Sequence, residues 1–154
     1  MSTTQPIRSK QLLHDFKEYF LTKQPNSRNY TLILIGLNTA LRINDILHLT
    51  WGDVYCTEHS RFYTHLLITE KKTEKETRIL INRELQETLL SYRKTQPSIA
   101  DTDYLFPSPR KADSPLSRYQ AYRIVRKAAE AVGIEDVIRC HCLLYTSPSP
   151  RDLS

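Results

Sequence analysis

One uninterrupted apolar segment constrains the fold of this chain more than any other feature. Residues 28–40 read RNYTLILIGLNTA, and after Arg28 they carry no charged side chain. A helix of this sequence is apolar on nearly every side, so it has to lie in the middle of a domain. The segment is much shorter than the roughly 20 apolar residues that span a membrane. Ser27 is the residue expected to cap its first turn.

Helical patterns flank this central segment on both sides. Before it, apolar residues recur at helical spacing after Ser9, until Pro25 ends the pattern. After it, a short helix follows Arg42, another helix begins after Asn82, and a last one covers about residues 117–132. The chain therefore reads as helical at both ends.

Between these helices the hydrophobic period changes. Residues 62–69 and 77–82 are rich in β-branched and aromatic side chains, and the charged run 70–76, EKKTEKE, separates them. This arrangement predicts a β-hairpin with a solvated turn. The predicted fold class is mainly α with a small antiparallel β-hairpin or sheet on one edge (α+β).

Composition indicates the size of the domain, the charge of its partner and its cellular compartment. The chain has 154 residues, enough for one domain with a buried core and a tail, and its net charge of +5 leans toward a polyanionic partner. Three cysteines, two of them separated by one residue, do not form a disulfide framework and fit a reducing compartment. The N-terminal segment lacks the apolar core of a signal peptide. We therefore expect a cytoplasmic protein with no membrane partner.

Arg42 is the first residue that could carry chemistry. It stands between the apolar helix and a short helix predicted in the segment INDILHLTW, so its guanidinium extends from a rigid element rather than from a loop. Asp45, three residues later, lies on the same side of a helical turn and could orient it. A fixed guanidinium matches two oxygens of a phosphate, whereas a solvated surface arginine is the simpler alternative.

Two further clusters have competing interpretations. The charged run 70–76 is either a solvated turn or the carrier of a lysine that protonates the leaving oxygen of a phosphodiester. Cys140, His141 and Cys142 suggest a metal, but neighbouring residues cannot all ligate one ion well. Cys56 and His59, which could complete such a site, lack zinc-finger spacing. We therefore predict no metal and no cofactor.

The segment from Asn38 to Asp53, NTALRINDILHLTWGD, resembles the first arginine motif of the tyrosine recombinases, the phage-integrase family. That motif is usually written T-G-L-R-x-x-E-x-L-x-L-x-W-x-D. The following run KKTEKETRILIN resembles the family's K-T-x-K hairpin, and the family's L-F-P-S loop is present at residues 105–108. The resemblance covers roughly residues 8–142, and it implies a partial recombinase catalytic domain over residues 1–142.

The resemblance also implies roles for individual residues. Arg42 would be the first phosphate-binding arginine and Asp45 its orienting acid. Lys72 would protonate the leaving 5′ oxygen, and His141 would open the His-x-x-Arg motif. The implied DNA contacts come from Lys71, Lys75, Arg123 and Arg126. The implied partners are duplex DNA carrying a recombination site and sister protomers, and the implied mechanism uses a 3′-phosphotyrosine intermediate without a metal or small-molecule cofactor.

The C-terminal end departs from the family pattern. Position 144 should be the arginine of His-x-x-Arg, but it is Leu144. Tyr145 lies four residues after His141, whereas the family's nucleophilic tyrosine lies several tens of residues later. Residues 143–154 have two Ser-Pro steps and no helical period, so we expect a disordered, non-native tail. A natural disordered C-terminus is the alternative.

Two other functions fit parts of the sequence. A non-catalytic DNA-binding module of the same fold would use Arg42, Lys72 and the basic helix to bind phosphates. A helical metal-binding interaction protein would instead depend on the cysteines and histidines.

We predict that the chain as written binds DNA weakly and forms no covalent adduct, because no tyrosine stands where the family places its nucleophile. Incubation with a nicked duplex that traps phosphotyrosine intermediates, followed by denaturing electrophoresis, tests this. A family member with complete motifs is the positive control. A protein band linked to DNA would contradict the prediction.

Overall fold

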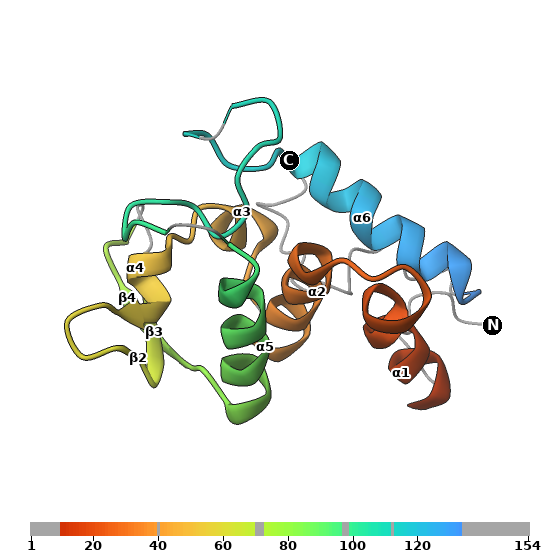
Figure 1. Ribbon diagram of the computed structural model, residues 1–154, viewed down its shortest axis with the longest axis horizontal. Helices are drawn as coiled ribbons and strands as arrows, with labels where there is room; N and C mark the ends of the chain where they lie inside the picture. The colour runs from red at the N-terminus through yellow and green to blue at the C-terminus, as the bar shows by residue number, and fades with distance from the viewer. Residues whose placement is uncertain (1–9, 40, 70–72, 97–98, 112, 134–154) are drawn as a thin grey trace.

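The computed structural model describes residues 10–39, 41–69, 73–96, 99–111 and 113–133. The helices are α1 (Lys10–Glu18), the π-helical turn η1 (Tyr19–Lys23), α2 (Ser27–Thr39), α3 (Ile43–Leu47), α4 (Trp51–Val54), α5 (Arg83–Lys94) and α6 (Arg118–Ala131). The strands are β1 (Tyr55–Cys56), β2 (Arg61–Phe62), β3 (His65–Thr69) and β4 (Glu76–Leu80). The strands lie at one end of the molecule and α1 and α6 at the other, with α2 and α5 between them (Figure 1). The predicted α+β fold class is confirmed.

Helix α2 forms the centre of the core, as its apolar sequence predicts. Every side chain of residues 31–35 is buried, and so is Gly36. Helix α5 packs along α2, while α1, η1 and α3 contact its other sides (Figure 1). Asn82 at the start of α5 bonds to Asn38 near the end of α2, so the two helices run antiparallel. The helix without a polar face is thus covered by its neighbours.

The cap of α2 lies one residue earlier than the sequence predicts. The side-chain oxygen of Asn26 accepts the backbone N–H of Asn29 at 3.0 Å. Ser27 is already the first helical residue, and its carbonyl accepts the Thr31 hydroxyl at 2.7 Å. Asn and Ser are equally good caps in isolation, so the sequence pattern alone does not separate them.

The predicted strand over residues 62–69 is in fact two strands that belong to different sheets. Phe62 pairs with Tyr55 in the antiparallel β1–β2 pair, and the two rings meet edge to face at 4.9 Å. Strand β3 pairs with β4 from His65↔Leu80 to Thr69↔Glu76. The change occurs at Tyr63, whose N–H donates to the Val54 carbonyl at 2.8 Å. The predicted hairpin is confirmed, with a shorter first strand.

The long connection between α5 and α6 is held by backbone bonds. The side chains of Leu105 and Phe106 are fully buried. The Leu105 N–H donates to the Leu49 carbonyl at 2.9 Å, and the Leu116 N–H donates to the Phe106 carbonyl at 2.7 Å. Ser117 and Gln120 then cap α6 reciprocally. This irregular segment therefore has a fixed path across the core.

None of the helices within the described residues has the length and apolar content to cross a membrane.

We predict that Leu34→Ala destabilises the domain strongly, because Leu34 is fully buried in the middle of α2. Such a cavity costs about 2–5 kcal/mol of unfolding free energy. Leu67→Ala is the matched control, since Leu67 is 57% exposed on β3. Urea unfolding followed by circular dichroism measures both changes. Equal losses in the two variants would contradict the central position of α2.

Candidate functional site

Arg42 stands at the junction between α2 and α3. Its backbone is extended, with φ −70° and ψ 151°, and it is the residue immediately before the first turn of α3. Its carbonyl accepts the Ile46 N–H at 3.1 Å. Leu41 and Ile43 on either side are both only 6% exposed, while Arg42 itself is half-buried. Two buried neighbours therefore fix the point from which the guanidinium extends.

The end of α2 that leads to Arg42 is tied down by polar side chains. The Thr39 hydroxyl donates to the Ile35 carbonyl at 2.7 Å and accepts the Leu41 N–H at 3.3 Å. The Asn38 amide donates to the Leu34 carbonyl at 2.9 Å. These bonds fix the backbone at the C-terminal end of α2.

Asn38 also connects the arginine junction to the hairpin. Its side-chain oxygen accepts the Asn82 amide at 2.8 Å, and the oxygen of Asn82 in turn accepts the Leu85 N–H at 2.9 Å. Asn82 follows β4 after a single residue and caps α5. The sequence analysis missed this pair, since 44 residues separate its members. The bond fixes the arginine junction relative to the base of the β3–β4 hairpin.

Asp45 lies in the first turn of α3, as the sequence predicts, and is half-buried. Its proposed role, to orient Arg42, stays a prediction.

The second half of the arginine motif has a structural role. The backbone N–H and hydroxyl of Thr50 donate to one Asp53 oxygen at 2.9 and 3.1 Å, which caps α4. Trp51 is buried, with its ring 5.4 Å from that of Tyr92. A Cβ at Gly52 would lie 3.0 Å from the Asp101 carbonyl oxygen, so a larger residue here would require the Asp101 loop to move by a few tenths of an ångström. Thr50 to Asp53 thus form a capped and packed segment directly after α3.

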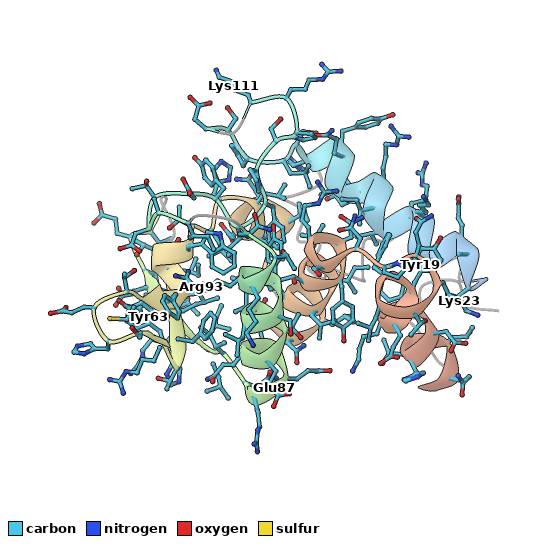
Figure 2. The ribbon with its side chains drawn as sticks, viewed as in Figure 1. Tyr19, Lys23, Tyr63, Glu87, Arg93 and Lys111 are labelled. Atoms are coloured by element: carbon cyan, nitrogen blue, oxygen red, sulfur yellow. The ribbon has the colours of Figure 1, made fainter. Side chains whose placement is uncertain are left out.

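Arg93 and Tyr92 contact this segment from α5. The Arg93 guanidinium lies 3.9 Å from the centre of the Tyr55 ring and 5.7 Å from that of Trp51, between α5 and α4 (Figure 2). The Tyr92 hydroxyl donates to the Leu105 carbonyl at 2.5 Å. Burial raises the pKa of Tyr92 to about 12. Tyr92 is therefore a packing residue and is unsuited to act as a nucleophile.

The lysine run lies at the tip of the β3–β4 hairpin. The last paired residues are Thr69 and Glu76, and Thr73, Glu74 and Lys75 are the described residues between them. The Lys75 N–H donates to the Thr73 hydroxyl at 3.2 Å, and the Lys75 side chain is exposed. Lys71 and Lys72 lie outside the described residues, as does His141. Their predicted roles stay predictions.

Arg123 and Arg126 lie on the exposed face of α6 and line a groove of about 840 Å³. Arg28 from the first turn of α2 and Lys127 line the same groove, which makes it strongly basic. The sequence analysis missed Arg28, because nothing local shows that α2 begins beside α6. Arg42 does not line this groove. The 13 residues of α2 separate Arg28 from the arginine junction by roughly 20 Å at 1.5 Å per residue.

One set of possible metal ligands occurs within the described residues. The ligand atoms of Cys56, Glu58 and His59 all lie within 4.8 Å of one another in the turn between β1 and β2. No metal site was predicted at Cys56 and His59, because these residues lack zinc-finger spacing, and no role was predicted for Glu58. Cys140 and Cys142 lie outside the described residues.

The fold is similar to solved recombinases. The similarity to XerA recombinase has a TM-score of 0.66 at 20% identity, over 86% of this chain and 45% of that protein. For lambda integrase bound to DNA the TM-score is 0.58 at 15% identity, with the same coverage. For the Tn1549 transposon integrase in complex with circular intermediate DNA it is 0.55 at 18% identity, over 99% of this chain and 56% of that one. The chain thus spans about half the length of these proteins.

Sequence relatives agree with the fold. A probable integrase/recombinase of Bacillus subtilis (strain 168), YoeC, is 42% identical over 137 residues, which cover 89% of this chain and 69% of the relative. The model of the phage integrase family matches residues 5–144. By both the family model and the identity to this relative, the chain belongs to the phage integrase family.

Proposed function

We propose that this chain forms part of the catalytic domain of a tyrosine-type site-specific DNA recombinase, and that Arg42 binds the phosphate at which the strand is cut. The observation that carries the proposal is the setting of Arg42. Arg42 matches the arginine of the family motif. It lies between two buried residues, Leu41 and Ile43, directly before α3. A guanidinium held in this way does not have to reorganise when charge develops on the phosphate.

The proposed chemistry uses side chains alone. A tyrosine attacks the scissile phosphate and forms a 3′-phosphotyrosine bond, while Lys72 protonates the leaving 5′ oxygen. Asp45 orients Arg42, and His141 contacts the same phosphate. Negative charge builds on the non-bridging oxygens in the transition state, where Arg42 stabilises it. Loss of one such preorganised donor costs about 3–4 kcal/mol, or 100- to 1,000-fold in rate.

Duplex DNA is the proposed partner. Solved structures of the same fold hold DNA: lambda integrase is bound to DNA, and the Tn1549 integrase is in complex with circular intermediate DNA. The basic side chains of this chain suit such a partner. Sister protomers are proposed as further partners, because strand exchange brings several active sites together. The protein would act in the cytoplasm.

A non-catalytic DNA-binding module of the same fold is the second candidate. The basic groove favours it, since Arg28, Arg123, Arg126 and Lys127 can bind phosphates without any chemistry. Neither candidate is expected to link this chain covalently to DNA, so the full-length gene sequence separates them: a downstream arginine, histidine and tyrosine would indicate a recombinase. For either candidate, the salt dependence of DNA affinity gives the number of phosphate contacts.

We expect Arg42→Ala to remove one phosphate contact. The slope of log affinity for duplex DNA against log salt concentration should fall in magnitude by about 0.9. Fluorescence anisotropy with a short labelled duplex at several salt concentrations measures this slope. Lys94→Ala is the control, because Lys94 is exposed in the last turn of α5, away from the arginine junction. An unchanged slope for Arg42→Ala would remove Arg42 from the DNA interface.

For the groove, we expect the double variant Arg123→Ala/Arg126→Ala to reduce the same slope by about 1.8, or two contacts. Arg118→Ala is the matched control on the same helix, since Arg118 is exposed but does not line the groove. Because Arg42 does not line the groove, the two losses should add when combined. A slope equal to that of the wild type would show that α6 does not contact DNA.

A further inference from the structure

The turn between β1 and β2 holds three side chains of the kinds that bind transition metals. Cys56 is half-buried at the end of β1, and Glu58 and His59 are exposed in the turn. Their sulfur, carboxylate oxygen and imidazole nitrogen atoms lie within 4.8 Å of one another. They lie at the end of the molecule marked by Tyr63 in Figure 2, in elements other than those that carry Arg42 and the basic groove.

The backbone holds these donors together without help from a ligand. Cys56 pairs with Arg61 across the strands, so only four residues form the turn. The Ser60 N–H donates to the Thr57 carbonyl at 3.3 Å, and Ser60 has a φ of 53°. This tight reversal folds Glu58 and His59 back toward the thiol. The Thr57 hydroxyl also donates to the Asp101 carboxylate at 2.6 Å, which ties the turn to the neighbouring loop.

The base of the turn is rigid as well. The edge-to-face contact of Tyr55 with Phe62 closes the strand pair, and the Arg93 guanidinium covers Tyr55 at 3.9 Å. The donors thus extend from a supported hairpin, which lowers the entropy cost of gathering them around an ion.

The charges around the turn favour a cation. Glu58 lies in the turn, and the Asp101 carboxylate accepts the Thr57 hydroxyl beside it, so two carboxylates lie near the thiol. Arg61 opposes these charges from across the strand pair, but its side chain is exposed and its charge is therefore screened by water.

The three kinds of ligand atom, sulfur, nitrogen and oxygen, suit a zinc ion. Thiolate, imidazole and carboxylate together are typical ligands of Zn²⁺, at about 2.3, 2.1 and 2.1 Å respectively. Tetrahedral geometry at these distances puts the ligand atoms about 3.5 Å apart, so a closure of roughly 1 Å completes the site. We propose that Cys56, Glu58 and His59 bind one Zn²⁺ ion, with water in the fourth position.

A cobalt titration of the purified full chain tests the proposal. Co²⁺ takes the place of Zn²⁺ and gives a thiolate-to-metal charge-transfer absorbance that rises to one equivalent and disappears on addition of Zn²⁺. We expect Cys56→Ser to abolish this band, and His59→Ala and Glu58→Gln each to weaken binding at least tenfold. The variant Cys140→Ser/Cys142→Ser is the matched control, because it removes the other two thiols, and it should keep the band.

Three results would overturn the proposal: no saturable band in the wild-type chain, a band that survives Cys56→Ser, or a band lost in the Cys140→Ser/Cys142→Ser variant. Binding that depends on Cys56 but is unchanged in both His59→Ala and Glu58→Gln would show simple thiol coordination and would also overturn it. His59 and Glu58 are exposed turn residues, so their variants keep the fold. Circular dichroism confirms this for each variant.

Discussion

The burial of α2 is the constraint on which the rest of the structure depends. The four residues Leu32, Ile33, Leu34 and Ile35 are at most 1% exposed. Burying each of them contributes about 1.5–3 kcal/mol, so together they contribute an amount comparable to the net stability of a whole domain. No orientation of this helix leaves an acceptable face in water. The other helices are therefore arranged by what they must cover, and the positions of both basic sites follow from the two ends of α2.

The arginine motif combines two kinds of residue that sequence similarity alone does not separate. Arg42 is half-buried and is proposed to bind phosphate, whereas Trp51, Gly52 and Asp53 face inward or cap a helix. The inward residues hold α4 against α5 and the loop that contains Asp103, whose carbonyl accepts the Trp51 N–H at 2.9 Å. Several residues of this motif therefore serve packing and helix capping. Arg42 is the residue of the motif that is proposed to bind phosphate.

The sequence predicted those parts of the fold that depend on local pattern. Apolar periodicity located α1, α5 and α6, because each buries a continuous stripe, and a run with no polar face located α2. The sequence pattern missed α4, which is a four-residue helix made by one reciprocal cap, and it joined β2 to β3, since nothing local shows that Tyr63 bonds to Val54. For the site, the motif found Arg42. The sequence predicted Asn82 as the cap of α5 but not its bond to Asn38, nor the surroundings of Arg28 and Glu58. These depend on neighbours that are distant in sequence or turned back by a tight loop.

The hydrogen bond between Asn38 and Asn82 has a consequence for how this sequence can change over time. Each amide also satisfies a backbone group, the Leu34 carbonyl for Asn38 and the Leu85 N–H for Asn82. Replacing one of them leaves a part-buried polar partner unsatisfied, whereas replacing both removes the mutual demand. A substitution at either position therefore changes the bonding of the other, across a gap of 44 residues.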